Sequence, residues 1–197
     1  YFELAAKQHN SNALLGLGLL YESGLGVNRD FVKATEYFKE SAQLGNPGAL
    51  ANMGNMYLNG IAVEKNVEKA LQCYEQSAKM NNSSALINLG QMYLNGVGVQ
   101  QNSQKAIECY EKAAQQNNSV ALVNLGNMYF NGIGVQQDYE KAKSYYEQAA
   151  NQNNPDGLFY LGMHYLSGQG TNSDFQKARL YFELSAKQNH PKALFQL

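Results

Sequence analysis

The chain has 197 residues, a formal net charge of −1 and two cysteines. Its 15 basic and 16 acidic residues leave no excess of Lys and Arg for binding nucleic acid or an anionic membrane. No apolar run in the sequence approaches the roughly 18 residues of a membrane-spanning helix. We therefore expect a protein that binds no nucleic acid and does not insert into a membrane.

A glycine recurs every 36 residues, and a tyrosine follows each one after three positions. A strict period of 20–50 residues is typical of one supersecondary unit stacked on copies of itself. The sequence therefore predicts a solenoid in which each unit contacts its neighbours. We expect the recurring glycines at close helix crossings. They are Gly18, Gly54, Gly90, Gly126 and Gly162.

Two similar segments indicate how the repeats divide the chain. Residues 1–10 (YFELAAKQHN) closely match residues 181–190 (YFELSAKQNH), five periods later. We therefore expect the chain to start within one repeat, to stop within another, and to be a piece of a longer array. The predicted units are a partial second helix at 1–9, complete repeats at 10–45, 46–81, 82–117, 118–153 and 154–189, and a partial first helix at 190–197.

Each complete repeat is predicted to contain two antiparallel helices, as residues 46–81 illustrate. Asn46 is a preferred N-cap residue, and Pro47 suits the first position of a helix. Gly60 is typical of a residue just past a helix end, and Asn66 predicts the cap of the second helix. Apolar residues at helical spacing lie in between, so each helix is expected to bury one face against its neighbours.

The pattern of one repeat resembles a known family. Residues 121–150 (ALVNLGNMYFNGIGVQQDYEKAKSYYEQAA) are similar, almost position for position, to the Sel1-like repeat, a relative of the tetratricopeptide repeat. The resemblance covers essentially the whole chain. It implies an all-α fold, a right-handed α–α superhelix that serves as a scaffold or adaptor. Local departures from the pattern are Lys39, Ala62, Gln169 and Thr171.

The function that this resemblance implies is a non-catalytic protein-interaction scaffold that binds an extended peptide or a partner protein in its concave groove. Two alternatives stay open. In the first, the array is the regulatory or targeting part of a larger enzyme, such as a kinase or a ubiquitin ligase; this alternative includes a role in endoplasmic-reticulum quality control. In the other alternative it is a secreted effector that binds host proteins. We expect no enzymatic activity in this segment, because no candidate catalytic residues recur or converge.

Residue patterns that suggest a cofactor have a structural explanation in this sequence. Gly-x-Gly pairs such as Gly96 and Gly98 lack the preceding strand and the third glycine of a dinucleotide-binding motif. His9, His164 and His190 lie far apart, and no cluster has the spacing of metal ligands. We therefore expect no metal and no cofactor.

A lysine recurs once in each second helix. A row of lysines suggests phosphate binding, but a solvated helix edge is the better interpretation, because acidic residues such as Glu36 and Glu108 lie three positions on and can pair with them. The row consists of Lys33, Lys69, Lys105, Lys141 and Lys177.

The two cysteines, Cys73 and Cys109, lie one repeat apart. Equivalent positions in stacked helix pairs are roughly 10 Å apart, whereas a disulfide needs Cα atoms within about 7 Å. We therefore predict two reduced thiols. Together with the lack of a leader or a transmembrane segment, they favour a cytoplasmic location, although the compartment is not fixed by the sequence.

Amide side chains on the first helices are the candidate partner-binding residues. They step by three along each helix and therefore share a face, which the family resemblance places on the concave surface. Because an amide is both a donor and an acceptor, a row of amides can hold the backbone of an extended peptide. The candidates are Asn52, Asn55, Asn88, Gln91, Asn124 and Asn127.

Apolar residues beside the amides are expected to supply pockets, with hot spots at the two ends of the array, because aromatic and Met side chains dominate interface energetics. These candidates are Leu15, Leu19, Ile87, Val123, Phe159, Tyr160 and Met163. The alternative interpretation is that the 23 asparagines reflect general composition and that the apolar ends pack against further repeats. We also expect the isolated array to fray or to self-associate end to end, since Phe195 and Leu197 take apolar positions.

Overall fold

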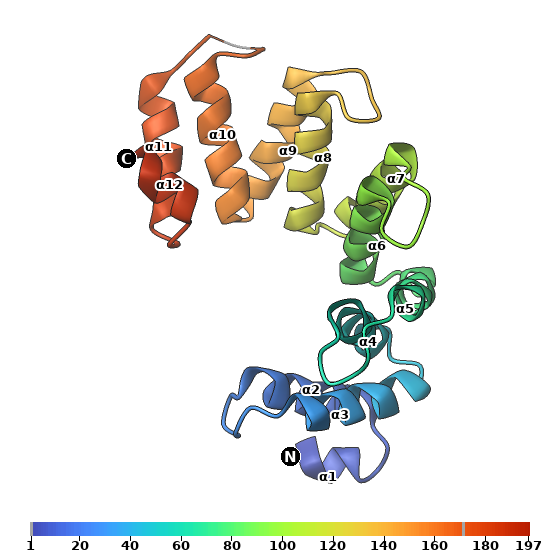
Figure 1. Cartoon of the computed structure of the whole chain (residues 1–197). Coiled ribbons are helices and arrows are strands. Elements are labelled where there is room, and N and C mark those ends of the chain that lie inside the picture. The colour runs from blue at the N-terminus through green and yellow to red at the C-terminus, as the bar shows by residue number, and fades with distance from the viewer. Residues whose placement is uncertain (1, 171) are drawn as a thin grey trace. The chain divides into compact units, whose positions relative to one another are not determined.

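The computed structural model describes residues 2–170 and 172–197, and each regular element in these residues is a helix (Figure 1). The predicted all-α fold is therefore confirmed. Thr171, which departs from the repeat pattern, lies outside the described residues. The chain divides into two compact units, Tyr1–Gln101 and Asn102–Leu197, and each is described by itself.

Both units are built from helices of similar length, with a short helix near each end of the chain. The helices of the first unit are α1 (Phe2–Ala6), α2 (Ser11–Ser23), α3 (Phe31–Gln43), α4 (Pro47–Asn59), α5 (Val67–Lys79) and α6 (Ser83–Asn95). Those of the second unit are α7 (Ser103–Ala114), α8 (Ser119–Asn131), α9 (Tyr139–Asn151), α10 (Pro155–Ser167), α11 (Phe175–Ala186) and α12 (Pro191–Gln196).

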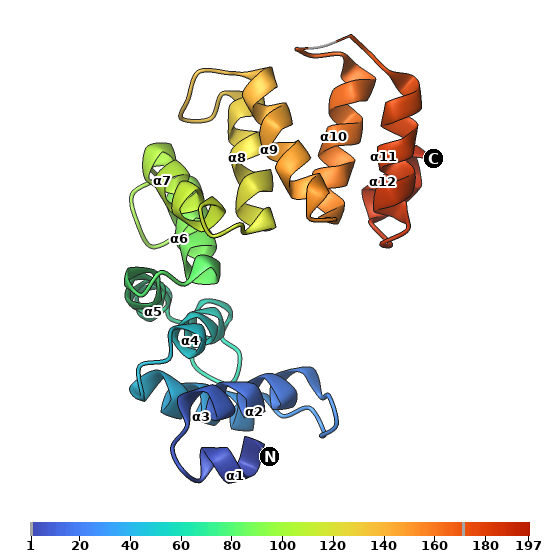
Figure 2. The same cartoon turned by 180° about the vertical axis from the view of Figure 1, so that it is seen from behind.

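Within each unit, each helix packs against the next helix along the chain. In the first unit α2 packs on α3 and α4 on α5, and α3 also packs on α4. In the second unit α8 packs on α9, and α10 packs on both α9 and α11, so these helices stand side by side in both views (Figures 1 and 2). Within each unit, this is the nearest-neighbour packing that a solenoid requires.

The predicted caps are confirmed in the structure. The side chain of Asn46 accepts a hydrogen bond from the Ala49 N–H at the start of α4, and Asn66 accepts one from the Lys69 N–H at the start of α5. Gly60 ends α4 in the left-handed conformation, with φ of 70°. Local side-chain chemistry therefore sets where these helices begin and end.

Asparagines also form the tight turns between repeats. The last turn residue before the next repeat has a positive φ, which asparagine tolerates better than most residues other than glycine. Residues in this conformation are His9, Gly45, Asn81, Asn117, Asn153 and Asn189. Part of the high asparagine content is therefore explained by backbone conformation.

Ala62 occupies a loop position where the other repeats have glycine. Its φ is 56°, while Gly98 and Gly134, at the equivalent position, have φ of 69° and 72°. An alanine in the left-handed region carries a strain of about 1 kcal/mol. We expect Ala62→Gly to raise the free energy of unfolding by about 0.5–1 kcal/mol, measured by urea denaturation. Gly98→Ala is the matched reverse change and should destabilise the protein, since its Cβ would also lie 2.5 Å from Val67. A loss of stability in Ala62→Gly would contradict this account.

Four of the recurring glycines, Gly18, Gly54, Gly126 and Gly162, lie under aromatic rings of the second helices, as expected for close crossings. A Cβ at Gly54 would lie 2.5 Å from the Tyr74 ring, and one at Gly162 would lie 2.7 Å from the Phe182 ring. Because these rings are buried, the glycines allow each ring to rest directly on the backbone of the first helix.

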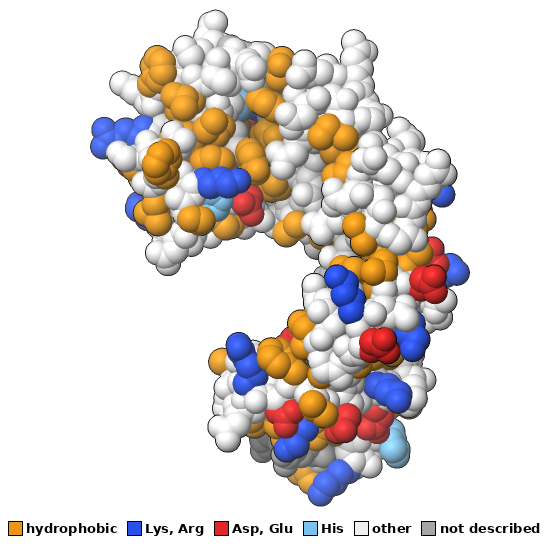
Figure 3. Space-filling model, in the orientation of Figure 1, with side chains coloured by type: hydrophobic (Ala, Val, Ile, Leu, Met, Phe, Trp, Pro, Cys, Tyr) orange, Lys and Arg blue, Asp and Glu red, His pale blue; other side chains and the backbone are white. Residues whose placement is uncertain are grey.

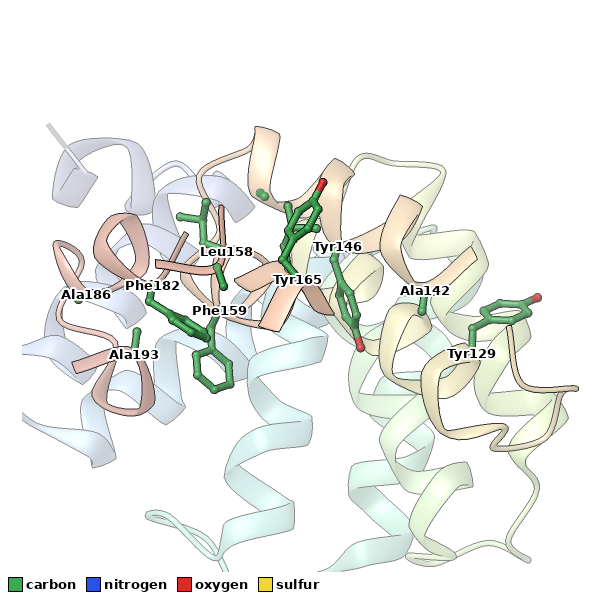
Figure 4. Close-up of a cluster of buried hydrophobic side chains, with 12 residues drawn as sticks. Tyr129, Ala142, Tyr146, Leu158, Phe159, Tyr165, Phe182, Ala186 and Ala193 are labelled. Atoms are coloured by element: carbon green, nitrogen blue, oxygen red, sulfur yellow. The ribbon is translucent and has the colours of Figure 1, made fainter. Parts of the chain in front are cut away.

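The core of the second unit is aromatic and spans α8 to α12 (Figure 4). Phe159 lies beside Phe182, with ring centroids 5.7 Å apart, and beside His190 at 4.9 Å. Polar contacts also hold the start of α10. Asn154 Nδ2 donates to Ser119 Oγ (2.9 Å), and Ser185 Oγ donates to the carbonyl of Pro155 (2.7 Å). These contacts fix the helix that carries Tyr160 and Met163.

Candidate functional site

In the first unit, Asn55 is the centre of a hydrogen-bond network inside the protein. Its Oδ1 accepts hydrogen bonds from the hydroxyl of Tyr74 (2.7 Å) and from Nδ2 of Asn88 (3.0 Å). Tyr74 is fully buried, and burial raises the pKa of this tyrosine to about 12, so its hydroxyl stays a donor. Asn55 and Asn88 therefore spend part of their hydrogen-bonding capacity within the fold, while Asn52 is half-buried.

In the second unit, Asn127 has the same relation to a tyrosine but keeps a free donor. The Tyr146 hydroxyl donates to Asn127 Oδ1 (2.8 Å). No described residue bonds to Asn127 Nδ2. Position 160, equivalent to Asn88 and Asn124, holds a tyrosine in place of an amide. Asn124 Nδ2 is buried without a partner among the described residues, and Gln91 in the first unit is exposed.

The sequence itself carries this relation in every repeat. Where the second helix has tyrosine at this position, the first helix has an amide, and where it has phenylalanine, the first helix has an apolar residue. The pairs are Tyr74 with Asn55, Tyr110 with Gln91, Tyr146 with Asn127, Phe38 with Leu19 and Phe182 with Met163. The hydroxyl and the amide thus occur together or not at all.

The predicted apolar residues differ in accessibility. Ile87 and Val123 are only 8% and 6% exposed, so these side chains fill helix contacts and do not form open pockets. Leu15 is half-buried and packs close to Gly48, whereas Leu19 is 43% exposed on α2. Neighbouring helices therefore cover Ile87 and Val123, and the predicted apolar residues are not equally accessible.

Four of the predicted residues come together in one groove of the second unit. The groove has a volume of about 380 Å³ and lies between α8, α9 and α10. Its predicted residues are Asn127, Phe159, Tyr160 and Met163; those not predicted are Phe130, Asn131, Tyr146, Ser167 and Gln169. In Figure 3 hydrophobic side chains gather on the surface over α10, α11 and α12.

Aromatic contacts shape this groove. Tyr160 stacks on Tyr146, with ring centroids 5.4 Å apart and planes 18° from parallel, and meets Phe159 edge-on at 5.4 Å. Phe130 is held by an edge contact with Tyr139 at 5.2 Å. Tyr160 and Met163 are half-buried, so each presents part of its surface to the groove. Stacked aromatic rings keep their geometry at low conformational cost.

The lining of the groove carries no charged side chain. Burial raises the pKa of Tyr146 well above its usual range, so its hydroxyl remains neutral and bonded to Asn127. The polar groups are amides, one serine and two tyrosine hydroxyls, which act as donors and acceptors without charge. The groove therefore fits an uncharged, apolar group with polar atoms at its edge.

A family model for the Sel1 repeat matches the chain five times in succession, at residues 11–46, 47–82, 83–118, 119–154 and 155–190. The chain belongs to the Sel1 repeat family. Proteins of this family are generally protein-interaction scaffolds, and their fold is a non-catalytic one.

Solved structures of Sel1 repeat proteins resemble this chain over most of its length. A Sel1 repeat protein from Oxalobacter formigenes has a TM-score of 0.90 and 29% identity, with 96% of this chain and 77% of that chain covered. A protective antigen present in uropathogenic Escherichia coli strains has a TM-score of 0.79 and 32% identity. That match covers 98% of this chain but 41% of the antigen.

A cysteine-rich protein, HcpB of Helicobacter pylori, has a TM-score of 0.52 and 29% identity over 68% of this chain and 96% of that one. No curated protein matches this Sel1 array by sequence. The two cysteines of this array, Cys73 and Cys109, are free thiols in the structure.

The lysine row of this Sel1 array packs on tyrosines. The ammonium group of Lys141 lies 4.1 Å from the ring centroid of Tyr129 and donates a hydrogen bond to its hydroxyl (2.7 Å). Lys33 and Lys69 lie 5.2 and 5.4 Å from the rings of Tyr21 and Tyr57. These cation–π contacts support the interpretation of the row as a structural helix edge.

Two further features of the Sel1 array bear on partners. Within the described part of the chain, none of the helices has the length and hydrophobicity that crossing a bilayer requires. Nor do three or more His, Cys, Asp or Glu side chains in that part come together as a metal ion would need.

Proposed function

We propose that this Sel1 array binds an extended peptide of a partner protein in the groove between α8, α9 and α10, with an uncharged aromatic or aliphatic side chain as the anchor. The observation that carries the proposal is the replacement of two amides by Tyr160 and Met163, which gives the groove an apolar wall. Aromatic and Met side chains on an accessible, preformed surface are typical of interaction hot spots.

The polar edge of the groove supports an extended backbone as the occupant. Asn127 Nδ2 has no partner in the described residues, and Asn131, Ser167 and Gln169 are exposed around it. An anchor side chain in the groove would bring its own peptide carbonyl near the amide donors of Asn127, Asn131 and Gln169. The fixed tyrosine stack means that the cost of ordering falls mainly on the peptide.

The probe for this proposal is a phage-displayed library of random short peptides, selected against the 197-residue protein. Selected sequences should share an aromatic or aliphatic residue and lack acidic residues at that position. One selected peptide is then synthesised, and its Kd is measured by fluorescence polarisation. The test variant is Tyr160→Asn/Met163→Asn, which restores the residues found at Asn124 and Asn127 of the preceding repeat.

We expect the double variant to bind the peptide at least about tenfold more weakly, since a buried aromatic anchor contributes about 1.5–3 kcal/mol. The matched control is Leu180→Asn, which removes a 51% exposed apolar side chain from α11, outside the groove, and should leave the Kd unchanged. Equal affinity of the double variant and the natural sequence would contradict the proposal, as would selection of peptides without a shared apolar residue.

A further inference from the structure

His164 is a buried titratable side chain with no hydrogen-bond partner. It lies on α10 with 0% exposure, and neither Nδ1 nor Nε2 bonds to any described residue. The equivalent positions of the preceding repeats hold the buried methionines Met56, Met92 and Met128. A polar, ionisable ring therefore takes a place that three other repeats fill with a thioether and the first repeat fills with Leu20.

The charged groups that face His164 lie on α9. Lys143 lowers the pKa of the histidine, while Glu140 and Glu147 raise it by smaller amounts. Lys143 and Glu147 form an ion pair with each other at 3.9 Å, and Lys143 also lies 5.6 Å from the ring centroid of Tyr165. Neither carboxylate bonds to the imidazole, so a protonated His164 would have no acceptor.

The titratable groups of the other neighbouring helices are engaged elsewhere. On α11, Arg179 pairs with Glu183 (2.9 Å), and Lys177 pairs with Asp174 (3.5 Å) at the helix start. Tyr181 of α11 stacks on Tyr165 of α10. On α8, the Tyr129 hydroxyl accepts a hydrogen bond from Lys141.

The groups of α10 itself are engaged as well. Asp156 accepts a hydrogen bond from His190 (3.1 Å), and Tyr160 stacks on Tyr146. The ring of Tyr165 meets His164 edge-on, with centroids 6.2 Å apart. None of these groups bonds to the imidazole.

Burial is the main cause that lowers the pKa of His164, and the positive charge of Lys143 is the second. The folded state therefore binds fewer protons than the unfolded state, in which histidine titrates near its ordinary value of about 6.5. Stability is consequently unaffected above that value and falls as the pH drops below it. One proton changes the unfolding equilibrium by up to about tenfold per pH unit.

The same two helices form the groove together with α8. Tyr146 comes from α9, and Phe159, Tyr160 and Met163 come from α10, which also carries His164. A charge forced between α9 and α10 would separate the stacked rings of Tyr146 and Tyr160. We propose that His164 makes the groove pH-sensitive, so that protonation in mildly acidic conditions loosens α10 from α9 and releases a bound peptide. This inference rests on the proposed function for its last step.

The first test compares unfolding in urea at several pH values between 7.5 and 5.0 for the natural protein and for His164→Met and His164→Gln. Methionine is the residue of the three preceding repeats, and glutamine keeps polarity without titration. As the pH falls below about 6.5, the unfolding equilibrium constant of the natural protein should rise more steeply than that of either variant. We expect the difference to reach up to about tenfold per pH unit. An NMR titration should also show a pKa of the His164 ring below the ordinary value of histidine. Identical pH profiles in all three proteins would overturn the inference.

The second test measures the Kd of the peptide selected above at pH 7.5 and 5.5. The natural protein should lose affinity, by up to about tenfold, whereas His164→Met, which lies outside the groove lining, should keep its affinity. Equal losses in the two proteins would overturn the release step. If no peptide binds at pH 7.5, the proposed function fails, and the unfolding comparison still decides whether His164 is a pH-sensitive element.

Discussion

Valine in place of Gly54 should destabilise the protein by about 3 kcal/mol, at the upper end of the range for overpacked cores. A Cβ at this position would lie 2.5 Å from Cε1 and 2.7 Å from Cδ1 of Tyr74, closer than van der Waals contact allows. The ring cannot move aside, because Tyr74 is fully buried and its hydroxyl is held by Asn55 at 2.7 Å. The expected result is a lower urea midpoint with an unchanged m-value.

A second substitution separates steric overlap from the loss of helix propensity that valine brings. Tyr74→Leu removes most of the ring, so Gly54→Val/Tyr74→Leu should lose clearly less stability than the sum of the two single variants. A coupling of about 1 kcal/mol or more is expected for residues in direct contact. Strict additivity would show that the glycine acts through backbone propensity and not through the ring.

Helix positions in this protein follow from local chemistry and were predictable for that reason. The caps at Asn46 and Asn66 and the stop at Gly60 depend on side chains and backbone within a few residues. The 36-residue period then copies each local signal along the chain. Because no long-range information is needed, one sequence was enough to predict these helices.

The role of the first-helix amides was less predictable because their partners lie on other helices. The sequence places Asn55 and Asn127 on one face, but their Oδ1 atoms accept hydrogen bonds from Tyr74 and Tyr146, each 19 residues away. A signal was present in the joint change of tyrosine with amide and of phenylalanine with apolar residue. A reading of one helix at a time does not detect it.

Four of the nine residues that line the groove were predicted from the sequence. Tyr160 and Met163 differ from the amides of the preceding repeats, and this difference is visible in the sequence. Phe130 has apolar equivalents in every repeat but the first, and Tyr146 has aromatic equivalents in every repeat, so nothing in the repeat pattern sets them apart. Their contribution comes from packing around Tyr160, as the stacking of Tyr146 on Tyr160 shows.

Asn127→Met should destabilise the protein by about 1–3 kcal/mol, the cost of leaving a buried hydroxyl without an acceptor. Tyr146 is 2% exposed, and its described hydrogen-bond partner is Asn127 Oδ1 at 2.8 Å. Tyr146→Phe should cost about 1 kcal/mol, because it leaves the half-buried Asn127 without its donor.

The double variant Asn127→Met/Tyr146→Phe reproduces Met163 and Phe182 of the next repeat. It should lose less stability than Asn127→Met alone, because the amide and the hydroxyl disappear together and leave no unpaired polar group. Urea denaturation of all four proteins gives the coupling energy. A double variant that loses the sum of both single effects would mean that Asn127 is not required by Tyr146. Recovery of stability in the double variant would instead show that Asn127 Oδ1 serves the fold as the acceptor of Tyr146. The Nδ2 atom of the same amide would then be the group available to a partner.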